Sequence, residues 1–353
     1  IFLSLLASSA LARQVIIPAP PELAATGYLV MDASTGKVLV EHNANELLPP
    51  ASLTKMMTSY IVSSEIHSGN MREEDMVDIS VTAWKMGGSK MFIREGTRVA
   101  IKDLLRGVII QSGNDASVAL AEHVAGSEGA FADVMNQQAA LLGMSNTTFK
   151  NATGWPAEGH MTTAKDLSLL AKAMINDYPE HYKLYSEKYF KFNGINQPNR
   201  NKLLFRDKTV DGIKTGHTDA AGYCLVSSAE KNGMRLIAVV MGTRSEEARA
   251  TESQKLLAYG FRYFQTHKVY DSGAELNTAK VWAGRGEEIG LGIQDAIFLT
   301  IPRGAQDELV AEMHIDEVIK APLKQGQELG NLTIRLNDEQ LVNVPLVALQ
   351  SIE

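Results

Sequence analysis

Residues 50–60 read PASLTKMMTSY, and they place a serine at the start of a helical stretch with a lysine three positions later. Pro49 and Pro50 lie at the start of this helical stretch, which continues to Gly69, and proline is favoured in the first turn of a helix. Residues three apart share one helix face, so Ser52 and Lys55 are expected to be neighbours. A helix start also offers unpaired N–H groups and the positive end of the helix dipole, which favour developing negative charge. The segment therefore predicts a serine nucleophile with a lysine beside it.

A serine hydroxyl is a weak nucleophile until a base removes its proton. Lys55 can be that base only in its neutral form, whereas an ordinary lysine has a pKa of about 10.4. Burial and a second positive charge both lower the pKa of a lysine. We expect Lys214 to supply that second charge.

Three short motifs occur in chain order, and together they are far more specific than any one of them alone. They are Ser52-Leu53-Thr54-Lys55, Ser112-Gly113-Asn114 and Lys214-Thr215-Gly216. Taken singly, each has a structural explanation: a serine that caps a helix, lysines that are solvated surface charges, and a Ser-Gly-Asn turn. The ordered set, with the first motif on a helix start and the third on a strand, favours acyl-transfer chemistry.

Hydrophobic periodicity and turn residues predict the elements around these motifs. In chain order we expect a hairpin at 28–41, two helical pieces in 102–124, helices at 129–142 and 163–176, strands within 208–243 with turns at 211–212 and 232–233, and a helix at 246–265. This order predicts an α/β domain in which an antiparallel sheet is flanked by helices, with the middle helices forming a cluster on one side.

The composition changes near residues 266–272. Residues 270–353 contain fourteen Asp and Glu and six Lys and Arg, a balance of −8, whereas the whole chain carries −7. Short β-like stretches broken by Gly and Pro predict a small β-rich sandwich there. We therefore expect a catalytic domain at 25–266 and a second domain at 270–353. The negative charge argues against nucleic acid as a partner, because binding phosphates needs a basic face.

The N-terminal residues 1–12 read IFLSLLASSALA, which resembles the apolar region and small-residue cleavage site of a secretory signal peptide. The chain has one cysteine, Cys224, in an apolar stretch, so we expect a buried thiol and no disulfide within the chain. The motifs call for no metal and no cofactor.

The chain resembles the low-molecular-mass penicillin-binding proteins, specifically the two-domain D-alanyl-D-alanine carboxypeptidases of the serine, SxxK type. The resemblance covers essentially all of 25–353, and three further stretches carry it besides residues 50–60: GVIIQSGNDASVALAEHVAG, QPNRN at 197–201 and VDGIKTGHTDAAGYCLVSSA. It implies a β-lactamase/transpeptidase-like domain followed by a β-rich C-terminal domain. It also implies that peptidoglycan stem peptides ending in D-Ala-D-Ala are the substrate and that β-lactam antibiotics acylate the protein.

The resemblance further implies a role for each site residue. Ser52 attacks the carbonyl of the penultimate D-Ala, Lys55 is the base, and Ser112 passes a proton to the leaving D-Ala. Asn114 and Lys214 bind the substrate within the second and third motifs, and the backbone N–H groups of Ser52 and His217 form the oxyanion hole. Thr215, in the segment that includes Gly216, receives the terminal carboxylate together with Arg249, and Arg200 is a weaker candidate. Helix neighbours such as Glu246, Glu252 or Ser253 are the alternative partners for Arg249.

Residues 151–160, NATGWPAEGH, depart from the His-Gly-Leu-Asp type of run that is common in relatives. We expect this loop to border the cleft. Family members often end in an amphipathic helix that lies on the inner membrane, and this sequence stops at LQSIE, where that helix would begin. The resemblance therefore implies a periplasmic protein, either free or peripheral on the outer face of the inner membrane.

Three other functions share this chemistry. A class A β-lactamase needs a deacylating glutamate in a Glu-x-x-Leu-Asn string, and residues 115–213 contain none. A penicillin sensor or peptidoglycan-binding module would be acylated once and would not turn over. A DD-endopeptidase would cut cross-links in place of the terminal residue, and the sequence leaves this alternative open.

Overall fold

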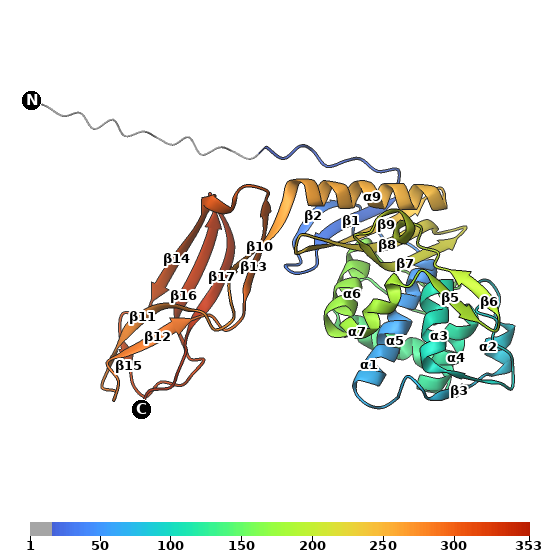
Figure 1. Cartoon of the computed structure of the whole chain (residues 1–353), viewed down its shortest axis with the longest axis horizontal. Coiled ribbons are helices and arrows are strands. Elements are labelled where there is room, and N and C mark those ends of the chain that lie inside the picture. The colour runs from blue at the N-terminus through green and yellow to red at the C-terminus, as the bar shows by residue number, and fades with distance from the viewer. Residues whose placement is uncertain (1–15) are drawn as a thin grey trace, which may run out of the picture. The chain divides into compact units, whose positions relative to one another are not determined.

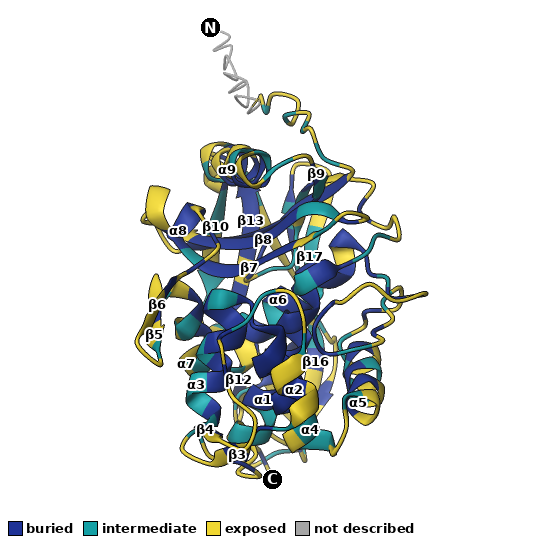
Figure 2. Ribbon diagram, turned by 90° about the vertical axis from the view of Figure 1, so that its right-hand side faces the viewer, coloured by how far each residue is buried: buried dark blue, intermediate teal, exposed yellow. Residues whose placement is uncertain are grey.

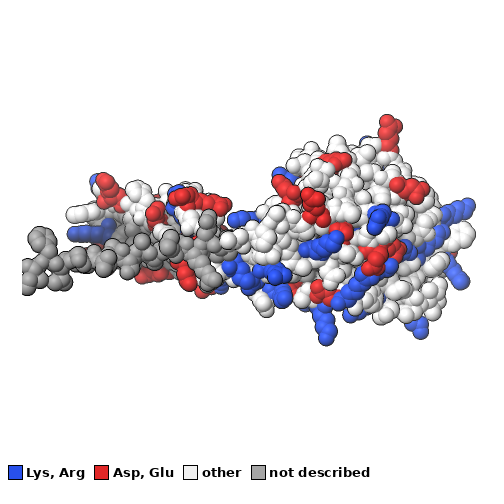
Figure 3. Space-filling view, turned by 90° about the horizontal axis from the view of Figure 1, so that it is seen from above, with Lys and Arg blue, Asp and Glu red and all other residues white. Residues whose placement is uncertain are grey.

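The structure, a computed structural model, describes residues 16–353, so the signal-peptide prediction at residues 1–12 lies outside the described residues. The chain divides into a larger compact unit, Pro20–Phe261, and a smaller one that contains Arg262–Glu353 (Figure 1). In the larger unit, Lys and Arg are interspersed with Asp and Glu on the face that Figure 3 shows. Within residues 16–353, no helix has the length and apolarity needed to cross a membrane.

A five-stranded antiparallel sheet is the frame of the larger unit. Its strands follow the order β2-β1-β9-β8-β7. Their bounds are β1 (Gly27–Asp32), β2 (Val38–His42), β7 (Val210–Thr218), β8 (Gly222–Lys231) and β9 (Met234–Thr243). Among the described strands, β8 is the one paired with β7, so β7 is an edge strand. The third motif therefore lies on an open edge of the sheet.

Helices cover both faces of this sheet, as the sequence pattern predicts (Figure 1). On one face, α9 (Glu246–Tyr263) packs closely at Gly260, where a Cβ would meet the side chains of Leu236 in β9 and Leu39 in β2. The other face carries α6 (Ala164–Asp177) and the helical cluster. Every residue from Lys55 to Ser63 of α1 is buried, so this helix forms the centre of the cluster (Figure 2).

The rest of the larger unit consists of short elements around α1. The helical segments are η1 (Ala51–Thr54), α1 (Lys55–His67), α2 (Val81–Lys85), α3 (Ile101–Arg106), η2 (Gly107–Gln111), α4 (Asn114–Ala125), α5 (Glu128–Leu141), α7 (Pro179–Tyr182), η3 (Lys183–Ser186) and α8 (Leu203–Arg206). Two small hairpins complete it, β3 (Met76–Asp78) with β4 (Arg98–Ala100) and β5 (Tyr189–Phe192) with β6 (Ile195–Pro198).

One of the two predicted turns in 208–243 is confirmed and the other is wrong. Asn232 and Gly233 have φ of 53° and 77° and connect β8 to β9, as expected for a tight hairpin. Asp211 and Gly212 lie inside β7. The glycine there serves close packing, because a Cβ on Gly212 would lie 2.5 Å from the Tyr182 hydroxyl.

The smaller unit is β-rich, as predicted. Strands β10 (Phe264–Tyr270) and β13 (Ile297–Pro302) form one sheet. The second sheet has the order β14-β16-β17-β12-β11-β15, with bounds β11 (Glu275–Trp282), β12 (Glu288–Gly292), β14 (Leu309–Ile315), β15 (Ile319–Lys320), β16 (Glu328–Leu336) and β17 (Glu339–Ala348); η4 (Gln306–Glu308) precedes β14. Apolar residues of β13 pack with those of β16 and β17 in one core, so the two sheets face each other.

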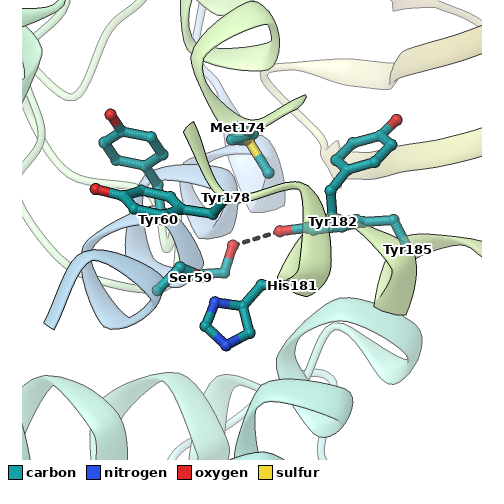
Figure 4. A pocket seen from close by; sticks show the side chains of 8 residues that line it. Ser59, Tyr60, Met174, Tyr178, His181, Tyr182 and Tyr185 are labelled. Carbon is teal, nitrogen blue, oxygen red and sulfur yellow. Dashed lines mark hydrogen bonds between the residues drawn. The ribbon is translucent and has the colours of Figure 1, made fainter. Parts of the chain in front are cut away.

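A small cavity lies among tyrosines of α1, α7 and η3 (Figure 4). Its volume is about 10 Å³, which is room for about one water molecule. Ser59 on α1 and Tyr185 on η3 share a short hydrogen bond at its wall. The cavity is therefore a gap in the packing and too small for a substrate.

Two leucines test where the helical core lies. Leu120 in α4 is 0% exposed, whereas Leu141 at the end of α5 is 80% exposed. Leu120→Ala should lower the free energy of unfolding by about 2–5 kcal/mol, because it leaves a cavity in a close-packed core. The matched control Leu141→Ala should change it by at most about 0.5 kcal/mol. Urea denaturation followed by circular dichroism measures both, and equal effects would contradict this placement of the core.

Candidate active site

Ser52 lies in a single 3-10 turn, η1, directly before α1. Two glycines let the neighbouring segments close on this turn. Gly154, with φ of 83°, lies so close that a Cβ there would collide with the carbonyl of Ala51. Gly216 on β7 is similarly close, since its Cβ would lie 3.0 Å from the Pro50 carbonyl oxygen. The serine is thus held between the 151–160 loop and the edge strand.

Lys55 is the centre of the site's hydrogen bonds. It is 1% exposed, and its Nζ donates to Ser52 Oγ at 3.0 Å, to Asn114 Oδ1 at 2.7 Å and to the Thr153 carbonyl at 2.5 Å. A neutral lysine keeps two N–H groups and one lone pair. If Asn114 and Thr153 accept the two N–H groups, the lone pair points at the Ser52 hydroxyl. The arrangement fits a base that takes the proton of Ser52.

Burial first, and then the positive charge of Arg200, lower the pKa of Lys55 to about 7. The sequence analysis expects Lys214 to be a second cation that acts on Lys55. Lys214 is itself buried, and its pKa is lowered first by burial and then by the charge of Lys55. The charges of the two buried lysines repel each other, so each lysine favours the neutral form of the other. Exposed Arg200 keeps its charge and acts on both lysines.

Ser112 is the junction between the second and third motifs. It follows the π-helical turn η2 and adopts φ of 64° and ψ of 37°, a left-handed conformation that a non-glycine residue rarely adopts. Its Oγ accepts a hydrogen bond from Lys214 Nζ at 2.9 Å, and Lys214 also donates to the Thr215 carbonyl at 3.0 Å. The strained turn thereby points a buried hydroxyl at the third motif.

Asn114 and Asp115 tie the loop at residues 87–93 to the start of α4. Asn114 Nδ2 donates to the Gly87 carbonyl at 2.7 Å. The buried Asp115 carboxylate accepts hydrogen bonds from four backbone N–H groups, those of residues 91, 92, 93 and 116. The sequence analysis missed Asp115, because an acidic residue in the first turn of a helix is usual and does not reveal that it anchors a loop.

The residues expected to bind the carboxylate lie at and behind the edge strand. Thr215 is buried, and exposed His217 stacks on Tyr223 with ring centroids 3.9 Å apart. Arg249 is 5% exposed, and its Nη1 donates to the Gly216 carbonyl at 3.2 Å. Among the described residues, Arg249 makes no ion pair with Glu246 or Glu252; Glu252 pairs with Lys255 instead.

A cleft of about 470 Å³ opens over Ser52. It is lined by Ser52, Gly88, Ser89, Asn114, Thr153, Gly154, Trp155, Pro156, His217, Thr218, Asp219 and Ala220. The prediction that the 151–160 loop borders the cleft is confirmed. At the end of this loop, buried His160 hydrogen-bonds Thr54 Oγ1 through Nε2 at 2.9 Å, and burial lowers its pKa to about 4. This link to the nucleophile's turn had no sequence signal.

The free cysteine and the metal-ligating residue types play no part in this site. Cys224 is buried as expected, and burial raises the pKa of its thiol to about 11, so it is not a nucleophile at neutral pH. Over the described part of the chain, residues 16–353, no cluster of three or more His, Cys, Asp or Glu could hold a metal ion.

Known proteins resemble both parts of the chain. Residues 14–245 match the D-alanyl-D-alanine carboxypeptidase family of S11 peptidases, and residues 264–353 match the C-terminal domain of penicillin-binding protein 5. Two Escherichia coli D-alanyl-D-alanine carboxypeptidases are similar: DacC is 44% identical (100% of this chain, 90% of that protein), and DacA is 43% identical (96% and 86%). The crystal structure of penicillin-binding protein 5 from Haemophilus influenzae matches with a TM-score of 0.90 and 41% identity, covering 95% of this chain and 99% of that one.

Gly154 offers a test of whether the close packing of the 151–160 loop positions Ser52. Gly154→Ala should slow labelling of the protein by a fluorescent penicillin by about 100-fold or more, because the new methyl group displaces the turn that carries the serine. Gly159→Ala is the matched control: it has a similar φ of 73° in the same loop, but its Cβ would meet only the flexible end of Lys150. Equal labelling rates for the two variants would show that close packing at Gly154 does not position Ser52.

Proposed function

The chain belongs to the D-alanyl-D-alanine carboxypeptidase family of serine peptidases, and we propose that it removes the terminal D-alanine from peptidoglycan stem peptides through an acyl-enzyme on Ser52. The observation that carries this proposal is the hydrogen bond from a buried lysine of lowered pKa to the hydroxyl of Ser52. β-Lactam antibiotics would acylate the same serine, since they too present a carbonyl and a carboxylate.

In acylation, neutral Lys55 takes the proton of Ser52 while Oγ attacks the carbonyl carbon of the penultimate D-Ala. The backbone N–H groups of Ser52 and His217 stabilise the oxyanion that forms. The C–N bond then breaks, and Ser112 relays to the leaving amine the proton that Lys55 took from Ser52, while the hydrogen bond from Lys214 holds the Ser112 hydroxyl in place. Water hydrolyses the ester and returns Ser52 to its free form.

Thr215 and Arg249 are the proposed receptors of the terminal carboxylate. One of the five N–H donors of Arg249 donates a hydrogen bond to the Gly216 carbonyl, so the other donors remain for a carboxylate. Arginine suits this task because its planar group can form two parallel charge-assisted hydrogen bonds. Exposed Arg200 is the second candidate, because its charge already reaches both lysines of the site.

We also propose the setting in which the enzyme works. Its substrate lies in the cell envelope, so we place it in the periplasm, attached to the inner membrane if a C-terminal anchor follows Glu353. We propose a catalytic domain at 25–266 and a domain at 270–353 that acts as a spacer or docking module. The support for the second role is that the motif residues all lie before residue 266.

Incubation with penicillin should give one covalent adduct per chain, mapped by mass spectrometry to the peptide that contains Ser52. Ser52→Ala should give no adduct and should release no D-alanine from a D-Ala-D-Ala peptide, because no other activated hydroxyl replaces it. Full adduct formation on that variant would refute the assignment. Product analysis on cross-linked muropeptides separates carboxypeptidase from endopeptidase activity in the same preparation.

The rate of penicillin acylation should rise with pH through an apparent pKa near 7, because Lys55 must be neutral to act as the base. Arg200→Gln removes a positive charge that lowers this pKa. The acid limb of the pH–rate profile of this variant should therefore move to higher pH. Lys202→Gln, which removes a nearby surface cation paired with Glu246, is the control and should leave the limb in place. Rates measured over about pH 5 to 9 decide this, and an unshifted limb in Arg200→Gln would contradict it.

Arg249→Ala should lower kcat/KM for a D-Ala-D-Ala peptide by about 30- to 1000-fold, or about 2–4 kcal/mol, if the guanidinium binds the carboxylate in a partly dry cleft. Amidating the C-terminus of the peptide should then lower kcat/KM by a far larger factor for the wild type than for the variant. If amidation costs both enzymes the same factor, the carboxylate is bound by Thr215 or Arg200 instead.

A further inference from the structure

Positive charge is concentrated in the segment that contains the β5–β6 hairpin and α8. Residues 183–208 contain seven Lys and Arg and two Asp and Glu, a balance of +5, whereas the whole chain carries −7. Lys183, Lys202 and Arg206 form ion pairs with nearby glutamates. Within the described residues 16–353, Lys188 and Lys191 form no ion pair, and both are exposed. Their charges are therefore available to an anionic ligand.

The β5–β6 hairpin buries one face and exposes the other. Phe190 is 7% exposed and belongs to the core of the larger unit. Successive residues of a strand point to opposite faces, so Tyr189 and Lys191 share the outer face. Asn196 in β6 lies opposite Lys191 and is exposed on the same face. The outer side chains of the hairpin are thus free of the core.

Two exposed aromatic rings meet where the hairpin contacts α8. Figure 2 shows β5, β6 and α8 on one side of the larger unit. Tyr189 is 58% exposed and Phe205 in α8 is 43% exposed, and their ring centroids lie 5.7 Å apart in an edge-to-face arrangement. Lys188 Nζ lies 5.7 Å from the centroid of the Phe205 ring. Exposed apolar surface with a polar rim is typical of a binding surface.

This surface is separate from the cleft over Ser52 but close to the catalytic lysines. None of the four residues Lys188, Tyr189, Lys191 and Phe205 lines the cleft. Arg200 follows the last residue of β6 by two positions, and its positive charge acts on both buried lysines of the site. A charge acts over about 10 Å at ordinary ionic strength. A polymer bound to the hairpin would therefore lie near the catalytic centre.

The proposed substrate is part of such a polymer, in which glycan strands carry stem peptides with free carboxylates. The C–H face of a sugar packs against an aromatic ring by dispersion, and unpaired lysines attract carboxylates. An anionic membrane also attracts cations, but insertion needs apolar side chains that are free to enter the bilayer. Here the ammonium group of Lys188 lies over Phe205, and the hairpin adds polar Lys191 and Asn196. The surface therefore favours an anionic glycan.

We propose that Lys188, Tyr189, Lys191 and Phe205 form a second binding site for the peptidoglycan polymer, outside the catalytic cleft. The two rings pack against a sugar of the glycan strand, and the two ammonium groups pair with carboxylates of its stem peptides. Binding to the strand raises the effective concentration of stem peptides at the cleft. The identity of the polymer rests on the function proposed above.

Co-sedimentation of the full chain with purified peptidoglycan sacculi tests the proposal, with excess penicillin present so that the cleft is filled. The double variant Tyr189→Ala/Phe205→Ala should raise the Kd by about tenfold. Lys188→Gln/Lys191→Gln should raise it by about threefold and make it less dependent on salt. Without penicillin, both variants should release D-alanine from a soluble acetylated tripeptide at the wild-type rate, because the four residues lie outside the cleft lining.

Phe298→Ala and Lys231→Gln are the matched controls, and both should bind sacculi as the wild type does. Phe298 is 42% exposed and has Lys268 Nζ 5.9 Å from its ring centroid, and Lys231 is an exposed lysine at the end of β8. A wild type that does not bind sacculi would overturn the proposal, and so would equal losses in the patch variants and the controls. Patch variants that lose binding to phosphatidylglycerol vesicles but keep binding to sacculi would overturn it in favour of a membrane surface. Failure of the wild type to release D-alanine from the soluble tripeptide is a separate result, which contradicts the proposed function itself.

Discussion

The burial of one ammonium group is the constraint on which the rest of the site depends. A lysine out of water loses much of its preference for the charged form, and the nearby charge of Arg200 adds to the loss. The protein compensates by giving Lys55 Nζ three oxygen partners from three separate segments. Because those partners come from the η1 turn, the start of α4 and the 151–160 loop, the position of each segment is tied to the same nitrogen atom.

Close approach of backbone to backbone explains why glycines surround the nucleophile. Gly154 presses on the Ala51 carbonyl and Gly216 on the Pro50 carbonyl, so a side chain at either position would push the serine turn away. Ser112 reaches its place at a different cost, through a left-handed backbone conformation. The reacting groups are thus positioned by rigid main chain more than by long side chains, which suits chemistry that depends on sub-ångström placement.

The sequence predicted the elements and the three motifs well, because helix periodicity, Asn-Gly turns and motif order are local signals. It failed where the structure depends on distant packing. Gly212 was read as part of a turn, yet it lies in β7 because Tyr182 packs against it. The argument from sequence named Lys214 as the cation that acts on Lys55; in the structure burial is the first cause of the lowered pKa, and the charge of Arg200, which that argument did not include, is the second. The hydrogen bond between His160 and Thr54 spans 106 positions and had no local signal.

Two buried lysines also link the stability of the enzyme to its surroundings. In the unfolded chain both take up protons at neutral pH, whereas in the fold their lowered pKa values favour the neutral form. Folding therefore releases protons, and the free energy of unfolding gains from these groups as pH rises from about 7 toward the ordinary pKa of lysine. Acidification has the opposite effect, because it recharges groups that have no access to water. The same feature that makes the serine reactive makes the folded enzyme less stable in an acidic medium.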